Sequence, residues 1–423
     1  MDRRQFLYTS GTTAGLMILK PKTAFGYEAN SAVRYALLGC GNRGTSVATS
    51  FAQNTDARIV ALADIFPDQL AKAKAHFDEV NTGLGHSAID PKLMFRGHDA
   101  YQQLAASPEV DAIQISTPPF FHVEHLDCVV SAGKHAYCEK PVGVDIAQTV
   151  RALEVARRVD GKVSIDVGFQ IRSAPPFVEI VKRIQAGEIG KIATISAHYN
   201  APAAVSHPDR PEMSADERRL RNWLWDRTLS GDILLEQNIH VIDICNWIMG
   251  THPISAVAKS SRLVVQNFGN TSDNYQVIFR YPGGVELSFS STQFGTDGFF
   301  DVTERIFGSN GVANAPYSGP IEIKGHNPWT WVDDAPANAA PGKFAANGAF
   351  TDNLRLADTM KDRGFIESIT SGRFHNQIAE GVSTARSCIL VRHAADTGHE
   401  VTWDDLQQNS EVFSLGMNIT QFT

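Results

Sequence analysis

Short apolar runs alternate with helical patterns over the first third of the chain. Each run has the length of a strand that is buried on both faces. The runs are Val33–Leu38, Arg58–Ala63, Asp111–Ser116 and His135–Cys138. The helical patterns between them are Thr45–Ala52, Pro67–Val80 and Tyr101–Ala106, and a further helix begins at Asp145. Because parallel strands need long crossover connections, this alternation predicts a parallel sheet with helices on both faces.

The pattern changes in the rest of the chain. Val163–Val167 and Ala193–Tyr199 alternate apolar and polar positions, which is typical of strands with one exposed face. Asn274–Tyr281 and Val285–Ser290 flank a Pro-Gly-Gly turn and predict a hairpin. Strands with hairpins and few helices predict a mostly antiparallel, open sheet. A last amphipathic helix is expected over Gln377–Thr397.

Two segments have the composition of long loops. Ala201–Leu220 is rich in proline and charge, and Ala335–Asn353 is rich in Ala, Pro, Gly and Asn. Tryptophans near these segments either stack on a ring-shaped ligand or anchor the loops. They are Trp223, Trp225, Trp329 and Trp331.

Composition narrows the class of protein. The 423 residues include 38 Lys and Arg against 46 Asp and Glu, a net charge of −8, and 43% are hydrophobic. These values indicate a globular chain and make nucleic acid an unexpected partner. The sequence has no apolar stretch of 18 residues, so no membrane span is expected in the mature protein. The five scattered cysteines indicate buried thiols rather than a disulfide scaffold.

The first thirty residues read as a targeting segment. Paired Arg3-Arg4 precede Phe6-Leu7 and a short, weakly apolar stretch, which resembles a bacterial twin-arginine export signal. Asp2 and Tyr8 depart from the usual signal. A protein exported by this route is folded first and reaches the periplasm with any bound cofactor. The alternative is a basic N-terminus on a cytoplasmic enzyme.

A glycine motif connects the first strand to the first helix. Gly39, Gly41 and Gly44 are spaced as G-x-G-x-x-G, and Asp64 ends the next strand 20 residues after Gly44. In this motif the glycines permit a tight turn, close approach of a pyrophosphate and helix–strand packing. Asp64 would accept hydrogen bonds from ribose hydroxyls and repel a 2′-phosphate, so NAD is favoured over NADP. The sequence therefore predicts a Rossmann dinucleotide-binding domain over residues 31–160 and an α+β domain over 161–423.

A second candidate site lies on an apolar helix. Glu236, His240 and Asp243 stand at i, i+4 and i+7, which places them on one helix face. Three polar groups on an apolar helix need partners or a cavity. By contrast, His122 and His125 lack a third ligand at sensible spacing, so we expect a solvated helix start there and no metal site.

Several motifs in one order resemble the Gfo/Idh/MocA superfamily of sugar oxidoreductases. The resemblance begins at Glu139-Lys140-Pro141 and covers nearly all of the mature chain. Its further motifs are Gly39–Gly44, Asp64, Thr117-Pro118, Val167-Gly168-Phe169-Gln170-x-Arg172, Gly231-Asp232, His240-x-x-Asp243 and Gly398–Trp403.

The resemblance implies roles for particular residues. Lys140 would hold the substrate hydroxyl and His240 would act as general base. Glu236, where the family more often has Asp, would orient His240 or bind substrate. The expected cofactor-binding residues are Gly39, Gly41, Asn42, Arg43, Gly44, Asp64, Thr117, Pro118, His122, Glu139 and Lys140. The expected substrate-binding residues are Arg172, Tyr199, Asp243 and Trp223. A homodimer or homotetramer is the family expectation.

These inferences predict a periplasmic, NAD-dependent oxidoreductase that acts on a sugar or glycoside. Free NAD should be scarce in the periplasm, so the cofactor is expected to stay bound. Either a second sugar is reduced in turn, or the cycle is redox-neutral and cleaves a glycoside. A sensor of nucleotide or sugar that has lost its chemistry is a further alternative, although Lys140 and His240 are both present.

Overall fold

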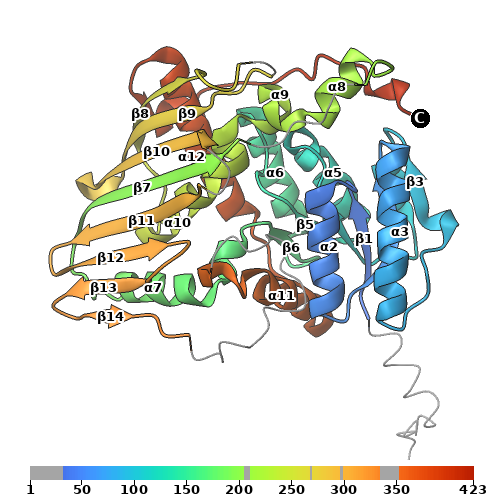
Figure 1. Cartoon of the computed structure of the whole chain (residues 1–423), viewed down its shortest axis with the longest axis horizontal. Helices are drawn as coiled ribbons and strands as arrows, with labels where there is room; N and C mark the ends of the chain where they lie inside the picture. Colours follow the sequence, from blue (N-terminus) through green and yellow to red (C-terminus); the bar gives the residue numbers. More distant parts are fainter. Residues whose placement is uncertain (1–31, 204–209, 267–268, 296–298, 334–351) are drawn as a thin grey trace, which may run out of the picture. The chain divides into compact units, whose positions relative to one another are not determined.

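The computed structural model describes residues 32–203, 210–266, 269–295, 299–333 and 352–423, whose arrangement Figure 1 shows. The predicted export signal and almost all of the predicted loop 335–353 lie outside the described residues. Within the described part of the chain, no helix has both the length and the apolar character needed to cross a membrane.

The first sheet has six parallel strands in the order β3-β2-β1-β4-β5-β6. They are β1 (Arg34–Leu38), β2 (Arg58–Asp64), β3 (Met94–Arg96), β4 (Ala112–Ile115), β5 (His135–Cys138) and β6 (Ile165–Val167). Separate apolar cores form on its two faces. One core includes α2 (Asn42–Asn54), α3 (Pro67–Gly83) and α11 (Ala357–Ser371). The other includes α4 (Ala100–Ala106), α5 (His122–Ser131) and α6 (Ile146–Val159). The predicted doubly covered parallel sheet is confirmed.

Strand β6 corrects one expectation. We expected Val163–Val167 to begin the second sheet, but β6 pairs in parallel with β5 and is buried. The alternation misled because its polar residues have internal partners. Ser164 Oγ lies 2.7 Å from Ser368 Oγ, and Asp166 pairs with His375.

The second sheet has nine strands in the order β14-β13-β12-β11-β7-β10-β9-β8-β15. They are β7 (Ile192–Pro202), β8 (Ser255–Ser261), β9 (Asn274–Arg280), β10 (Glu286–Gly295), β11 (Asp301–Gly308), β12 (Gly311–Pro316), β13 (Glu322–Gly325), β14 (Trp329–Thr330) and β15 (Val401–Thr402). Among these described strands only β7 and β10 pair in parallel. Helices α7 (Pro175–Gln185), α10 (Ile239–Met249) and α12 (Ile378–Thr397) pack against the sheet. The predicted hairpin and the mixed, mostly antiparallel sheet are confirmed.

Helix α12 was expected to be amphipathic, but it is not. It packs against β8 on one side and against α6 on another, so most of its middle positions are buried. Even the Arg392 side chain is fully buried, and its Nη1 donates to Val144 O (2.8 Å) and Gly231 O (3.2 Å). The helix therefore links the two sheets instead of presenting a face to solvent.

The expected loop over Ala201–Leu220 contains regular structure at both ends. Strand β7 continues to Pro202, and α8 (Ala215–Arg221) begins where Ser214 Oγ accepts from Glu217 N at 3.1 Å. Short helices α9 (Arg227–Ser230) and α13 (Trp403–Gln407) complete the helices of the described residues. The last residue of α8, Arg221, binds Asp68, which lies just beyond the carboxyl end of β2.

Candidate active site

The glycine turn between β1 and α2 has the shape that a dinucleotide requires. Gly39 has φ +94°, and a Cβ there would lie 2.6 Å from the Ser116 backbone. A Cβ on Gly44 would lie 2.1 Å from Gly39 O, so close helix–strand packing excludes a side chain. Around Gly41, which caps α2, a Cβ would meet nothing within 4 Å. This open space at a helix N-terminus can receive a pyrophosphate.

Asp64 stands beside this turn at the end of β2. Its Oδ2 accepts from Cys40 N at 2.6 Å, and its Oδ1 accepts from Phe66 N at 2.7 Å. Burial raises the pKa of Asp64 to about 6, against the effect of these two hydrogen bonds. The carboxylate therefore fixes the glycine turn, and each oxygen keeps a lone pair for a ligand hydroxyl.

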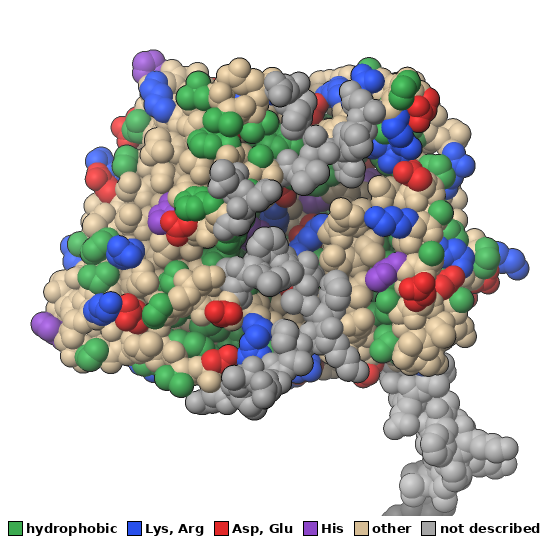
Figure 2. All heavy atoms as spheres, in the orientation of Figure 1, with side chains coloured by type: hydrophobic (Ala, Val, Ile, Leu, Met, Phe, Trp, Pro, Cys, Tyr) green, Lys and Arg blue, Asp and Glu red, His purple; other side chains and the backbone are tan. Residues whose placement is uncertain are grey.

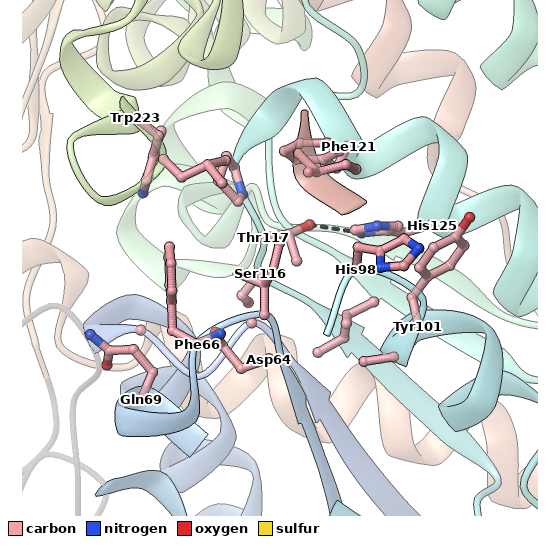
Figure 3. A pocket seen from close by; sticks show the side chains of 18 of the residues that line it. Asp64, Phe66, Gln69, His98, Tyr101, Ser116, Thr117, Phe121, His125 and Trp223 are labelled. Atoms are coloured by element: carbon pink, nitrogen blue, oxygen red, sulfur yellow. Dashed lines mark hydrogen bonds between the residues drawn. The ribbon is translucent and has the colours of Figure 1, made fainter. Parts of the chain in front are cut away.

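The first cavity opens from Asp64 across the ends of β2, β3 and β4. It is lined by Leu38, Gly39, Gly41, Asp64, Ile65, Phe66, Gln69, Gly97, His98, Ala100, Tyr101, Ser116, Thr117, Pro118, Phe121, His125, Leu220, Arg221, Trp223 and Ile419. Figure 3 shows Phe66 and Trp223 on one side and Tyr101 with His125 on the other. Thr117 Oγ1 lies 3.0 Å from His125 Nδ1. The mixture of aromatic walls and a few polar groups suits an adenosine.

The second cavity adjoins the first and shares six lining residues with it: Gly41, Gln69, Ser116, Thr117, Arg221 and Trp223. Figure 2 shows a hollow near the middle of the face, with basic and histidine side chains inside it. The second cavity is lined by Gly41, Asn42, Arg43, Gly44, Gln69, Ser116, Thr117, Pro119, His122, Glu139, Lys140, Gln170, Tyr199, Arg221, Asn222, Trp223, Leu224, Trp225, Glu236, Gln237 and His240. Most of the predicted site residues are therefore in one place.

Lys140 lies at the carboxyl end of β5 and reaches the second domain. Its Nζ lies 3.2 Å from Glu236 Oε1 and also donates to the Glu236 carbonyl oxygen. Next to it, Arg43 Nε lies 3.0 Å from Glu139 Oε1. The carboxylate of Glu236 is thus a partner of Lys140, and the structure shows no bond from it to His240 among the described contacts.

A π-helical turn over Leu234–Asn238 precedes α10. Glu236 lies in this wider turn and His240 in the first turn of α10, and both line the second cavity. Burial lowers the pKa of His240 well below its usual value, and the charges of Lys140 and Arg43 lower it further. His240 is therefore neutral near pH 7 and able to accept a proton.

Four polar atoms of the second cavity have no hydrogen-bond partner among the described residues. They are Gln170 Oε1, Glu236 Oε2, Gln237 Oε1 and His240 Nδ1. Buried polar atoms without partners are costly, by about 1–3 kcal/mol each. Each of these atoms is itself buried, so none of them is open to a ligand in the cavity.

The structure separates Arg172 and Asp243 from this cavity. Arg172 Nε and Nη2 lie 2.7 and 2.8 Å from the two oxygens of Asp243, and Thr384 Oγ1 donates to Asp243 Oδ1 at 2.8 Å. Asp243 is 1% exposed, and neither residue lines the second cavity. Arg172 and Asp243, which were expected to bind substrate, instead pair with each other and tie α10 to the segment after β6.

His122 also differs from its expected surroundings. It lines the second cavity as predicted for a cofactor-binding residue, but it is buried, not solvated. Its Nδ1 lies 2.8 Å from Pro141 O and its Nε2 lies 2.7 Å from Thr117 O. His122 therefore joins the backbone segments that carry Thr117 and Lys140.

The aromatic residues divide into two groups. Trp223, Trp225 and Tyr199 line the second cavity. Trp329 lies in β14 with the Arg183 guanidinium 4.5 Å from its ring, and Trp331 packs beside it. The ring-stacking interpretation therefore applies only to the first group.

The predicted site residues left out six polar residues that line the second cavity: Gln69, Ser116, Gln170, Arg221, Asn222 and Gln237. Gln170 carried a usable signal, because it directly follows β6 and ligands bind at the carboxyl ends of parallel strands. Placing that strand in the wrong sheet hid the signal. Gln237 and Asn222 carried none, since nothing in the sequence shows where their side chains point.

The glycine turn, the buried Asp64 and the adjoining Lys140–His240 cavity define a dinucleotide-dependent oxidoreductase. The chain belongs to the GFO/IDH/MocA oxidoreductase family. A family model described as "Oxidoreductase family, NAD-binding Rossmann fold" matches residues 33–167. A second one, "GFO/IDH/MocA C-terminal domain", matches residues 177–314.

Named relatives agree with this assignment. The chain is 29% identical over 295 residues to inositol 2-dehydrogenase from Rhizobium meliloti, which covers 69% of this chain and 78% of that one. Levoglucosan dehydrogenase in complex with NADH and levoglucosan has a TM-score of 0.68 at 18% identity, covering 88% and 99% of the two chains. Aldose-aldose oxidoreductase from Caulobacter crescentus has a TM-score of 0.66 at 19% identity, with coverage of 88% and 99%. Both structures share the fold of this chain.

Proposed function

We propose that the protein oxidises a CH–OH group of a sugar or glycoside. The observation that carries this proposal is that Lys140, whose Nζ lies 3.2 Å from Glu236 Oε1, and the neutral His240 line one cavity beside the glycine turn. The lining of that cavity is rich in polar side chains, including Asn42, Gln170 and Asn222, which suits a polyhydroxylated ring better than an apolar ligand. The relative named inositol 2-dehydrogenase acts on a ring of hydroxyl-bearing carbons, which supports the same substrate class.

Residues of the second cavity have different roles at the reacting hydroxyl group. Bound NAD would supply the hydride acceptor. His240, neutral because of its burial, takes the hydroxyl proton at Nε2, since its Nδ1 is buried. Lys140 donates a hydrogen bond to the same oxygen from Nζ, and Glu236 holds that ammonium group in place. Trp223 and Trp225 line the same cavity.

NAD rather than NADP is our proposed cofactor. A 2′-phosphate would approach the buried Asp64 carboxylate, and Ile65 follows where a cation would be needed. Arg221 lines the cavity, but its guanidinium is already bound to Asp68 at 3.0 and 2.8 Å and to Glu217 at 2.7 Å. In its described contacts, the Arg221 guanidinium is therefore already occupied by carboxylates and is not available to bind a phosphate.

We further propose that the protein is exported folded to the periplasm and works there with retained NAD. The Arg3-Arg4-x-Phe6-Leu7 segment supports export. The five cysteines are all unpaired, which suits folding in a reducing compartment. Retention would let the enzyme return the hydride to a second sugar, or to the same one during glycoside cleavage.

The test begins with protein purified without added nucleotide, denatured and examined by mass spectrometry. We expect about one NAD for each chain. The native protein is then given a panel of sugars and glycosides, and absorbance at the NADH wavelength is recorded. Reduction of bound NAD by a sugar supports the oxidoreductase. Release of an aglycone without net NADH supports the glycosidase. If no member of the panel reduces the bound NAD and none is cleaved, the proposal is contradicted.

Nucleotide binding should weaken as Asp64 is protonated. Because its pKa is raised to about 6, the carboxylate is ionised at pH 7.5 and mostly neutral at pH 5.5. If ribose hydroxyls bind the ionised form, the affinity is full above the pKa and is lost as pH falls through it. We expect about fourfold weaker NAD binding at pH 5.5, measured by calorimetry on nucleotide-free protein. Asp64→Asn should bind more weakly and lose this pH dependence; an unchanged dependence would contradict the role of Asp64.

A further inference from the structure

The segment that follows α13 returns from the second domain to the first. In Figure 1 it runs from beside β8 across α9 and α8 toward β3. Its start is fixed at Arg392 of α12, which pairs with Glu411 and lies 4.6 Å from the Phe413 ring. Phe413 N then donates to Asp145 Oδ2, at the start of α6, at 2.7 Å. We call residues 413–423 the C-terminal strap.

Helix α8 holds the middle of the strap. Arg219 Nη1 donates to Gly416 O at 3.1 Å. Asp216 Oδ2 accepts from Asn418 N at 3.1 Å and from Gln421 Nε2 at 2.8 Å. Beyond α8 the strap reaches the first sheet, where His98 N donates to Phe422 O at 3.1 Å. The strap thus connects α8 with the loop after β3.

The strap turns an apolar face inward. Phe413, Leu415, Met417 and Ile419 are half-buried, and the residues between them are exposed, so side chains alternate as in a strand. Leu415, Met417, Ile419 and Phe422 pack on a small cluster separate from the main cores. That cluster consists of Phe66, Phe121, Leu220 and Leu229.

Residues of this cluster and of the strap line the first cavity. Phe66 and Phe121 come from the ends of first-sheet strands, Leu220 from α8 and Ile419 from the strap, and all four line the cavity. Arg221 fastens α8 to the same cluster, because its guanidinium lies 3.9 Å from the Phe66 ring centre and binds Asp68 through both terminal nitrogens. Figure 3 shows Trp223 and Phe66 on one side of the cavity and Phe121 beside His125 on the other.

We infer that the C-terminal strap and α8 are a nucleotide-binding element that covers the adenosine half and holds the nucleotide through successive turnovers. The inference rests on the proposed function, which needs a nucleotide in the first cavity. Residues of the glycine turn hold the nucleotide from the sheet side, and Ile419, Leu220 and Trp223 cover it from the other side. Dissociation would require the strap to leave α8, so the main effect is on the dissociation rate.

The experiment measures that rate directly. Full-length protein is loaded with NADH, an excess of NAD is added, and the loss of bound-NADH fluorescence is followed with time. Ile419→Ala removes a cavity-lining side chain, and Asp216→Ala removes two strap hydrogen bonds without touching the cavity. We expect dissociation to become about tenfold faster or more in each variant.

Two control variants match these changes. Val412→Ala shortens an apolar side chain just before the strap, where Val412 is 69% exposed. Asp404→Ala removes another first-turn aspartate, from α13. Both should dissociate NADH at the wild-type rate. Thermal unfolding of nucleotide-free protein shows whether any variant has lost its fold, and a faster rate counts only in variants that unfold like the wild type.

The possible outcomes distinguish a failure of the strap inference from a failure of the proposed function. Wild-type rates in Ile419→Ala and Asp216→Ala would overturn the strap inference while leaving sugar oxidation intact. Equal acceleration in all four variants would also overturn it, since the effect would then be nonspecific. If wild-type protein binds no nucleotide, the proposed function itself fails. Faster release in the two strap variants alone, with hydride transfer in a single turnover unchanged, is the result that supports the inference.

Discussion

Replacing Lys140 by methionine is expected to lower kcat by about a hundredfold or more while leaving NADH affinity within about threefold. Methionine preserves most of the side chain's length but removes the ammonium group that lies 3.2 Å from Glu236 Oε1. The substrate oxygen then loses its hydrogen-bond donor, and Glu236 loses its partner. Steady-state kinetics with a sugar substrate and a separate NADH titration distinguish the two effects.

The same strand offers the control for this experiment. Lys134 precedes the amino end of β5, and its Nζ donates to Ser107 O at 2.9 Å and Val110 O at 2.7 Å. Lys134→Met removes a comparable ammonium group at the end of the strand remote from the cavity, so turnover should change little. Undiminished turnover in Lys140→Met, or an equal loss in Lys134→Met, would contradict the assignment of Lys140.

Replacing His240 by alanine is expected to lower kcat by about 10²- to 10⁴-fold, the usual contribution of a positioned general base. The wild-type enzyme should also keep its kcat/KM on acidification to below pH 6.5, because burial keeps the pKa of His240 well below its usual value. Activity requires the neutral ring and is lost only as pH falls through that lowered pKa. The pH profile of kcat/KM measures this directly.

His252 provides a comparison in the same region. It follows α10, and its ring stacks on Trp403 at 3.7 Å, outside the residues that line either cavity. His252→Ala should keep the wild-type pH profile and turnover, although it loses packing. A His240→Ala enzyme that retains normal turnover would show that another group accepts the proton.

The sequence was most informative where local geometry dictates residue type. Gly39 needs a positive φ and Gly44 has no room for a Cβ, so these positions could be read without a structure. Lys140 was found through the family resemblance, and its position after a buried strand, at the edge where ligands bind, agrees with that assignment. Burial was harder to predict: His122 and Asp166 look like surface residues but are satisfied by internal partners.

The sequence was least informative where distant segments meet. The spacing of Glu236, His240 and Asp243 shows neither the π-helical turn nor the pairing of Asp243 with Arg172 away from the cavity. The strap alternates apolar and polar residues from Phe413 to Ile419, yet that alternation does not say against which surface it packs. The contacts that place it, with α8 and with the cluster around Phe66, are visible only in the structure.

The return of the chain to the first sheet has a consequence for how the protein is made. Phe365 of α11 is fully buried against Phe51 of α2, at a ring distance of 5.9 Å, so one core of that sheet includes residues far along the chain. The nucleotide-binding half therefore cannot complete this core until α11 has been synthesised. Folding of the whole chain should follow release, and isolated residues 33–167 should not form a stable unit.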